Sequence, residues 1–484
     1  MRMEKRFLAM FLASVMALSG CAAGDGEASS VQQPTQAPPP VPALVTDIPA
    51  RPEEYYPVDW ARHGVIYEVN IRQYTEEGTF DAFSAHLQTL KDMGITTLWF
   101  MPIHPISETK RSGTLGSYYS VTDYRAVNPE FGTEEDFREL VDQAHAMGFT
   151  VIMDWVANHT GWDCPWIQEH PEWYTKDKNG NITDPPGMGW PDVADLDFSN
   201  PELRAEMISC MKYWVEEYDI DGFRCDYAAG VPRDFWELAR VNLETVKPVL
   251  MLAEDNSQKQ LLNYAFDCNY NWELYDTLLE IAGGSGSAYF IRNTFPANYP
   301  DGTWRLNFLD NHDKNSWERT IRDAFGVEAL PCLWALTYTL PGTPLVYSGD
   351  EIGLDHNIAF MERDPIDWES SDVDYRPLLA ELASIRRENP ALHSGNYGGG
   401  VQYTDIDRRA IMAFRRKAEG GDIYCLFNLT GEKIGADLST FLDGTGTVLL
   451  HGAGSGLLET EDSEAVPSGT ITLEPWEFWI IRKS

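Results

Sequence analysis

The chain has 484 residues, of which 43% are hydrophobic and 12% aromatic, enough for a large core, so a disordered chain is excluded. Its formal net charge is −38, from 75 acidic and 37 basic residues. Such a surface repels phosphate backbones, so nucleic acid is excluded as an expected partner, whereas an uncharged ligand would be indifferent to it.

The N-terminus has the pattern of an export signal. Three basic residues among the first six precede an apolar run at residues 7–18, which is too short to span a bilayer and is typical of a signal peptide. The Leu-Ser-Gly-Cys segment that follows resembles the lipobox of bacterial lipoproteins, in which the cysteine, here Cys21, is lipidated after cleavage. Residues 1–20 are therefore expected to be a signal peptide. We expect residues 21–55 to be the lipidated cysteine with a flexible linker, and the protein to be exported and lipid-anchored to the cell membrane or cell surface.

From residue 64 to about residue 388, short apolar strands alternate with helices. The predicted strands are residues 65–69, 97–100, 150–154, 222–225, 248–253, 266–270, 305–308 and 345–347. Each is nearly all apolar, as expected of strands that are covered on both faces. Eight βα repeats predict an α/β fold, a (β/α)8 TIM barrel over residues 56–390, with an open doubly wound sheet as the alternative.

Helix boundaries are marked by apolar spacing and by capping residues. Residues 80–90 carry apolar side chains at helical spacing and predict one helix. Thr133 with Asp136 three residues later is typical of a capping box. Asn200 before Pro201 predicts the start of another helix, because asparagine caps and proline fits the first turn.

Two regions depart from the βα repeat. Between Asp154 and Asn200 lie 45 residues rich in Trp, Pro, Gly and Asp without a clear helix, and a connection that long indicates a small inserted domain B, at about residues 160–199. After residue 390, short apolar segments separated by turn residues predict an antiparallel C-terminal β-sandwich over residues 391–484. Those segments are residues 411–414, 423–427, 448–450 and 478–481.

Carboxylates lie at the ends of four predicted strands. Asp154 ends the third strand, Asp226 and Glu254 follow the fourth and fifth, and Asp313 follows the seventh. The carboxyl ends of barrel strands meet at one mouth, so these side chains are expected to converge there. One such residue would be explained as a cap or a turn residue, but four at neighbouring strand ends would not.

The residue types around these carboxylates indicate acid–base chemistry. Arg224 and Asp226 are two residues apart on one strand and point the same way, so the fixed positive charge is expected to hold Asp226 ionised, as a nucleophile requires. Glu254 follows apolar residues, which raise a carboxyl pKa and suit a proton donor. One charged and one protonated carboxyl group is the arrangement of a glycosidase. A structural Arg–Asp pair beside an unrelated glutamate is the alternative.

Four segments, in chain order, resemble the signature segments of the α-amylase family, glycoside hydrolase family 13. They contain Asp154, Asn158 and His159; Gly222, Phe223, Arg224 and Asp226; Glu254; and Phe308, Asn311, His312 and Asp313. Residues 94–102, 119–124 and 342–351 are also similar to family segments, and the resemblance runs from about residue 60 to the end. Each motif alone is weak, but four in order at the expected strand ends are specific.

The resemblance implies a role for each of these residues. Asp226 would be the nucleophile, Glu254 the acid/base and Asp313 the third carboxylate, which holds ring hydroxyls of the sugar being cleaved. The implied substrate-binding residues are Tyr119, His159, Arg224 and His312. The expected activity is retaining hydrolysis of α-1,4-glucosidic bonds in starch or maltooligosaccharides. An α-glucosidase, an oligo-1,6-glucosidase, a glucan transferase and a non-catalytic glucan-binding protein stay open as alternatives.

The segment after Asp226 departs from the family pattern. Many α-amylases have Lys-His there, which contacts substrate and calcium, whereas this chain has Tyr227, Ala228, Ala229 and Gly230. Asn158 matches a calcium ligand of the family, but its partner is missing, so no cofactor is expected to be required and a calcium requirement is not predicted. The other six cysteines are widely spaced, which argues against a zinc site, and Cys225 is expected to be a buried thiol.

Overall fold

The computed structural model describes residues 44–296, 298–458 and 465–483. The predicted signal peptide, Cys21 and residues 22–43 of the predicted linker lie outside the described residues. In the part of the chain that is described, no helix combines the length and the apolar character needed to cross a membrane.

Eight parallel strands close into a barrel in the order β1-β10-β9-β8-β7-β6-β3-β2, which confirms the predicted fold. They are β1 (Ile66–Val69), β2 (Thr97–Phe100), β3 (Thr150–Trp155), β6 (Gly222–Cys225), β7 (Leu250–Ala253), β8 (Cys268–Tyr270), β9 (Trp304–Asn307) and β10 (Thr343–Tyr347). The strands are buried because each faces the barrel interior on one side and the surrounding helices on the other.

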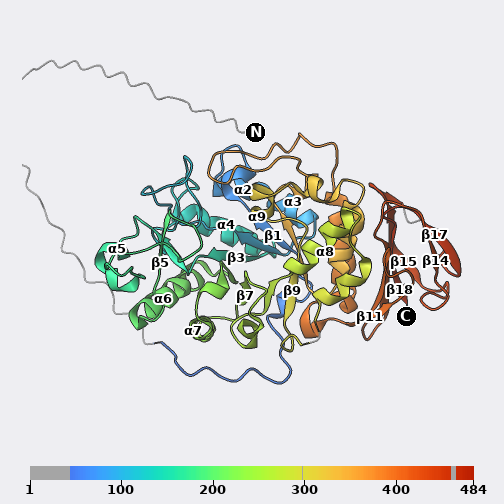
Figure 1. The fold of residues 1–484 in the computed structure, drawn as a ribbon, viewed down its shortest axis with the longest axis horizontal. Helices are drawn as coiled ribbons and strands as arrows, with labels where there is room; N and C mark the ends of the chain where they lie inside the picture. Colours follow the sequence, from blue (N-terminus) through green and yellow to red (C-terminus); the bar gives the residue numbers. More distant parts are fainter. Residues whose placement is uncertain (1–43, 297, 459–464, 484) are drawn as a thin grey trace, which may run out of the picture. The chain divides into compact units, whose positions relative to one another are not determined.

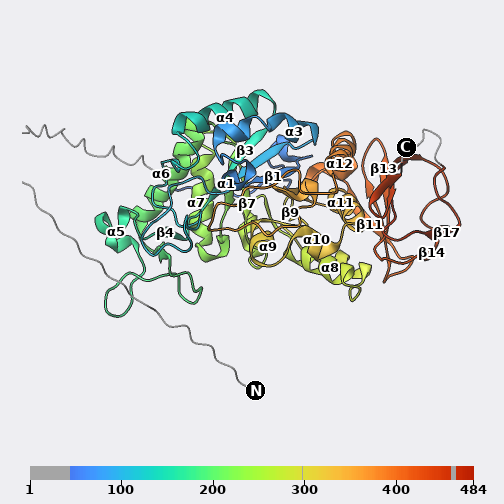
Figure 2. The same cartoon turned by 90° about the horizontal axis from the view of Figure 1, so that it is seen from above.

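The helices surround these strands, and α4 and α8 lie on opposite sides of the barrel in both ribbon views (Figures 1 and 2). They are α1 (Ile71–Tyr74), α2 (Phe80–Ser84), α3 (Leu87–Asp92), α4 (Glu134–Ala146), α6 (Pro201–Tyr218), α7 (Arg233–Leu243), α8 (Trp272–Ala282), α9 (His312–Trp317), α10 (Ile321–Phe325), α11 (Leu330–Thr339) and α12 (Arg376–Glu388). The predicted capping box is present at Thr133, and the Asn200 side chain accepts hydrogen bonds from the first turn of α6.

The single helix predicted at residues 80–90 is wrong, because the structure divides it into α2 and α3. The break lies at Ala85 and His86, where the His86 N–H donates to the Phe83 carbonyl at 2.8 Å. Such a bond to the third residue back tightens the turn and interrupts the α-helical ladder.

The long connection after β3 folds back on the mouth of the barrel. It contains β4 (His159–Gly161) and β5 (Val193–Asp195), which pair antiparallel, and the short helix α5 (Trp166–Glu169). The pairing places His159 opposite Asp195. His159 is thereby fixed beside the carboxyl ends of the strands rather than carried on an irregular loop.

The C-terminal strands form an antiparallel sheet in the order β11-β12-β13-β18-β15-β16, with the separate pair β14-β17. The strands are β11 (Gly400–Thr404), β12 (Ile411–Lys417), β13 (Asp422–Asn428), β14 (Ile434–Asp437), β15 (Thr447–Ala453), β16 (Gly456–Leu458), β17 (Thr470–Leu473) and β18 (Phe478–Lys483). One face of the larger sheet shares the core of the barrel, and a second core joins the other face to β14 and β17. The four segments predicted as strands in this region all contain strands.

Residues 44–55, the end of the predicted linker, make hydrogen bonds to the barrel domain. The Val45 N–H donates to Asn242 Oδ1 at 2.9 Å, and the Tyr55 hydroxyl donates to Asp267 Oδ1 at 2.6 Å. These contacts arise because the segment ends in aromatic and basic residues that can reach buried polar groups. The six cysteines of the described part, Cys225 among them, are buried free thiols.

Candidate active site

A cavity of roughly 310 Å³ opens at the carboxyl ends of the barrel strands. Its walls include six of the residues singled out from the sequence, namely Tyr119, His159, Asp226, Glu254, His312 and Asp313. Ser117, Met188, Trp190, Asp192, Val193, Tyr227, Trp317, Phe360 and Met361 complete the lining. The cavity therefore brings together polar groups from the segments that follow four barrel strands and from domain B.

The register of three adjacent strands explains why the carboxylates meet. Asp154 on β3 lies opposite Arg224 on β6, and Cys225 lies opposite Ala253 on β7. Asp226 and Glu254 are the next residues of those two strands, so they leave the sheet side by side. Asp313 comes from the first turn of α9, and its side chain is 40% exposed.

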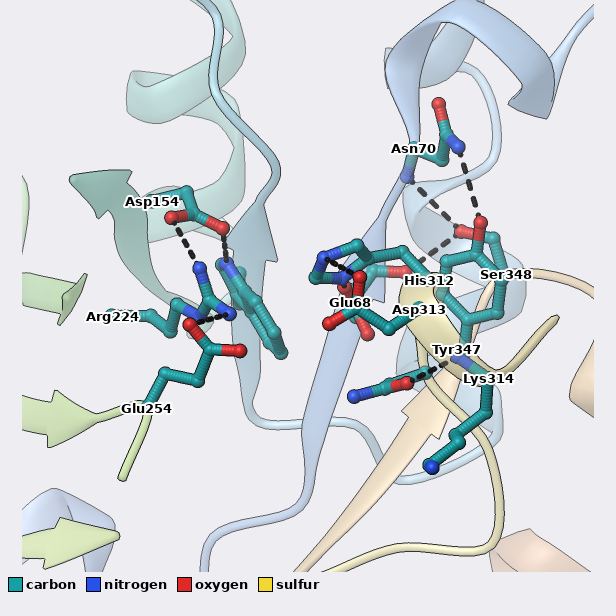
Figure 3. A network of polar contacts seen from close by, with 12 residues as sticks. Glu68, Asn70, Asp154, Arg224, Glu254, His312, Asp313, Lys314, Tyr347 and Ser348 are labelled. Carbon is teal, nitrogen blue, oxygen red and sulfur yellow. Dashed lines mark hydrogen bonds and ion pairs between the residues drawn. The ribbon is translucent and has the colours of Figure 1, made fainter. Parts of the chain in front are cut away.

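Arg224 is the centre of the carboxylate cluster (Figure 3). Its Nη1 donates to Asp154 Oδ1 and to Asp226 Oδ1, both at 2.9 Å. Its Nη2 forms an ion pair with Glu254 Oε2 at 3.0 Å, and its Nε donates to the Tyr270 hydroxyl at 3.2 Å. One planar guanidinium therefore fixes three carboxylates by a fork of donors.

The Arg224 side chain is 0% exposed and does not line the cavity. Its contacts are with the carboxylates and with the Tyr270 hydroxyl, and the prediction that it binds substrate stays a prediction. Its position two residues before Asp226 was sufficient to predict the contact with that carboxylate, and this contact is present at 2.9 Å.

Burial raises the pKa of both Asp226 and Glu254. The pKa of Glu254 is raised to about 7, with Arg224 opposing the shift and the Asp226 charge adding to it. The pKa of Asp226 is raised to about 6 by burial, again against the effect of Arg224. The sequence argument that Arg224 holds Asp226 ionised is thus right in direction, but burial outweighs it. Glu254 keeps its proton to the higher pH.

A second polar chain runs from the barrel interior to the cavity. Glu68 of β1 hydrogen-bonds His312 Nδ1 (Figure 3), and His312 Nε2 lies 2.9 Å from the Tyr119 hydroxyl. That hydroxyl donates to Asp154 Oδ2 at 3.0 Å. Burial lowers the pKa of His312, but Asp313 and Glu68 outweigh it and raise the pKa to about 9. A doubly protonated His312 donates to both Glu68 and the Tyr119 hydroxyl, so each side chain in this row of polar contacts has a partner.

His159 is neutral, because burial lowers its pKa to about 4. Its ring lies 5.6 Å from the Trp190 ring, and Trp190 in turn meets Tyr227 edge to face at 5.5 Å. On another part of the lining, Phe360 stacks on Tyr119. Trp317, whose ring centroid is 5.4 Å from that of Phe360, is 59% exposed. The cavity thus combines flat apolar surfaces with polar groups, as sugar-binding sites do.

Sequence reasoning missed several of these residues. Glu68 carried a usable signal, since it is a charged residue inside an apolar strand and is 0% exposed. Trp317 ends α9, and Phe360 and Met361 lie in a loop, so their approach to the cavity depends on tertiary packing. Of the aromatic residues at or after the ends of β3 and β6, Trp190 and Tyr227 line the cavity, whereas Trp155 is buried in the core and Trp162 lies outside the lining.

The surroundings of Asn158 were tested for a calcium site. Its amide nitrogen lies 3.3 Å from His159 Nδ1, and nowhere in the described residues do three or more His, Cys, Asp or Glu side chains gather in a way that could hold a metal ion. Calcium prefers six to eight oxygen ligands, so the acidic side chains of this region do not supply its donor set. The absence of a cofactor requirement stays a prediction.

The sequence matches the family model of the α-amylase catalytic domain over residues 54–184 and 188–245. A crystal structure of an α-amylase from Lactobacillus plantarum is 30% identical, with a TM-score of 0.76, covering 88% of this chain and 100% of that one. A maltogenic α-amylase from Thermotoga neapolitana is also 30% identical, with a TM-score of 0.74, covering 87% and 98%.

Among curated proteins, α-amylase MalA of Haloarcula japonica is 26% identical over 410 residues, which are 80% of this chain. The chain spans only 58% of the length of that relative. The barrel, the paired carboxylates at its mouth and the C-terminal sheet define a glycoside hydrolase of the α-amylase class. The chain belongs to the α-amylase family, as its 30% identity over the whole of the Lactobacillus plantarum structure shows.

Proposed function

We propose that the protein hydrolyses α-1,4-glucosidic bonds of starch or maltooligosaccharides with retention of the anomeric configuration. The observation that carries this proposal is the attachment of Asp226 and Glu254 to one guanidinium at the wall of a single cavity. A retaining glycosidase needs a nucleophile and an acid/base held close together, with the proton on the acid.

In the first step, Asp226 would attack the anomeric carbon. Its Oδ1 is bound to Arg224, which leaves Oδ2 as the oxygen available for attack. Glu254 would give its proton to the glycosidic oxygen as that bond breaks, which releases the leaving sugar and forms a glycosyl ester on Asp226. The higher pKa of Glu254, about 7, supports its role as the proton donor.

In the second step, ionised Glu254 would take a proton from water, which attacks the same carbon and releases a sugar of α configuration. Asp313 would bind ring hydroxyls, and its exposed carboxylate in the cavity wall supports this role. Tyr119, His159 and His312 would contact the same sugar, the first by stacking and the histidines by hydrogen bonds.

The bond and chain-length preference is tested by the products released from starch, maltotriose, pullulan and isomaltose. Hydrolysis of starch and maltotriose with α-configured first products is expected. Cleavage of isomaltose alone would instead favour an oligo-1,6-glucosidase, and longer products would favour a glucan transferase. A β-configured first product in polarimetry would refute retention.

The acid/base role is tested with Glu254→Gln, which should abolish hydrolysis while maltooligosaccharide binding, measured by calorimetry, persists. Asp226→Asn should be equally inactive. Full activity in Glu254→Gln would refute the assignment. Sugar binding without hydrolysis by the wild-type chain would favour a glucan-binding protein.

We also infer that the protein is exported and attached to a membrane through lipidated Cys21. The support is the basic, apolar and Leu-Ser-Gly-Cys succession in residues 2–21. Expression in a bacterial host with radiolabelled palmitate should label the wild type and recover it with membranes. Cys21→Ala should lose the label, and an equally labelled variant would contradict the inference.

A further inference from the structure

The residue directly after Asp226 has an uncommon backbone conformation. Tyr227 is left-handed, with φ 39° and ψ 50°. Residues other than glycine rarely adopt this conformation, and bulky ones do so only where the surrounding structure holds them. Such positions concentrate at functional sites, so the contacts that Tyr227 makes in this conformation indicate its use.

The left-handed turn directs the Tyr227 amide at the proposed acid/base. Its N–H donates to Glu254 Oε2 at 2.7 Å. The same oxygen lies 3.0 Å from Arg224 Nη2, so both donors meet one oxygen of the carboxyl group. An oxygen that accepts hydrogen bonds must present its lone pairs to the donors, so Oε2 is favoured as the unprotonated oxygen. The proton of Glu254 therefore lies on Oε1.

The ring of Tyr227 fixes this turn from the other side. A Cβ at Gly230 would lie 2.3 Å from Tyr227 Cε1, so the ring passes over Gly230 at a distance that only glycine permits. Trp190 meets the ring edge to face at 5.5 Å, and the Tyr227 hydroxyl donates to Met188 Sδ at 3.7 Å. The ring is thus held between the 3-10 turn at Ala228–Gly230 and domain B.

We infer that Tyr227 is a positioning residue for Glu254. Its ring, held over Gly230 and against Trp190, keeps the backbone left-handed, and the backbone amide then selects Oε1 as the oxygen that protonates the leaving group. The inference rests on the proposed function, since it assumes that Glu254 is the acid/base. It also explains the glycine at position 230, because a side chain there would displace the ring.

The backbone N–H of Tyr227 is one of several groups that set the ionisation of Glu254. The charged and titratable groups that act on Glu254 are Arg224, Asp226, Asp313, Asp154 and Tyr270. The hydrogen bond from the Tyr227 N–H stabilises the ionised form of Glu254, so it lowers the pKa of Glu254 against the raising effect of burial. Loss of the bond should therefore raise that pKa and move the alkaline limb of kcat/KM to higher pH.

The test compares Tyr227→Val, Tyr227→Asn and Tyr227→Phe, with wild-type-like circular dichroism as a condition for each. Valine is β-branched and disfavours the left-handed backbone, so kcat should fall roughly tenfold and the alkaline limb should rise by about one pH unit. Asparagine tolerates the left-handed backbone without the ring, so the limb should stay and KM should rise. Phenylalanine should leave both the alkaline limb and KM unchanged.

Gly230→Ala provides a second route that leaves Tyr227 in place, and it should reproduce the shift of the alkaline limb. Wild-type limbs in both Tyr227→Val and Gly230→Ala would overturn the inference, as would equal shifts in Tyr227→Asn and Tyr227→Val. Glu254→Gln distinguishes failure of the positioning role of Tyr227 from failure of the proposed function. If that variant is inactive while the limbs do not move, the positioning role fails and the proposed function stands; if it is active, the proposed function fails.

Discussion

Glu68 of the first barrel strand hydrogen-bonds His312, a residue 244 positions later that lines the cavity. Glu68 is 0% exposed and His312 is 2% exposed, so this contact joins two ionisable groups inside the barrel mouth. A carboxylate in this place costs free energy unless it is paired, and pairing it with His312 favours the protonated imidazole and fixes its orientation. The contact therefore links the first strand to the lining of the cavity.

The Glu68→Gln substitution should weaken this link. Burial lowers the pKa of His312, but Asp313 and Glu68 raise it to about 9, above the ordinary 6.5. The stabilisation from protonated His312 is complete below pH 6.5 and is lost as the pH rises through about 9. Between these pH values the unfolding free energy of the wild type should fall by about 2 kcal/mol more than that of the variant. Urea titrations measure the difference, and exposed Glu108→Gln is the control. Parallel pH curves for wild type and Glu68→Gln would contradict the prediction.

Arg224→Lys should damage activity although it keeps the charge. A single ammonium cannot reproduce the fork that contacts Asp154, Asp226 and Glu254, so these carboxylates lose their common partner. We expect kcat to fall by about 10³ and the unfolding free energy to drop by about 3 kcal/mol, because buried charges are left unpaired. Steady-state kinetics and urea unfolding test this, with Arg482→Lys on the exposed end of β18 as the matched control. A variant with kcat within a few-fold of wild type would show that the fork is dispensable.

The sequence was sufficient to predict the barrel because its strands and caps are local signals. The apolar segment that became β3 and the Thr133 capping box are visible in short windows, and the structure contains both. The convergence of Asp226 and Glu254 also followed from topology, since carboxyl ends of parallel strands share one edge. The kink at His86 was not predictable, because residues on either side of it keep helical apolar spacing.

The parts of the site that escaped prediction depend on contacts distant in sequence. Trp317 and Phe360 are 43 residues apart and line the cavity together because the end of α9 packs against the loop after β10. The wider contacts of Arg224 escaped prediction for a related reason. The sequence places Arg224 beside Asp226, but only the three-dimensional arrangement shows that Asp154, Tyr270 and Glu254 also surround it.

The pH dependence of kcat/KM should be bell-shaped with limbs near pH 6 and pH 7. Asp226, with a pKa of about 6, must be ionised, and Glu254, with a pKa of about 7, must be protonated. Because the two groups share Arg224, the apparent values belong to the cluster. Asp154→Asn removes a negative charge that raises the pKa of Asp226, so the acid limb should move to lower pH. Activity on a soluble maltooligosaccharide between pH 4 and pH 9 would measure this, and an unmoved acid limb in Asp154→Asn would contradict it.

Arg416 on β12 attaches the C-terminal sheet to the barrel. Its guanidinium is buried, has no carboxylate partner among the residues that the structure describes, and donates to the carbonyls of Thr339, His393 and Gly399 at 2.8–3.0 Å. Thr339 is the last residue of α11, whose terminal carbonyls carry partial negative charge, and this offsets the cost of burying the cation. Arg416→Met keeps the aliphatic packing but leaves the carbonyls unpaired, so the unfolding free energy should fall by about 3 kcal/mol. Exposed Arg409→Met should change it by less than about 0.5 kcal/mol. Urea unfolding followed by tryptophan fluorescence measures both, and equal midpoints for the two variants would show that the carbonyl contacts contribute nothing beyond packing.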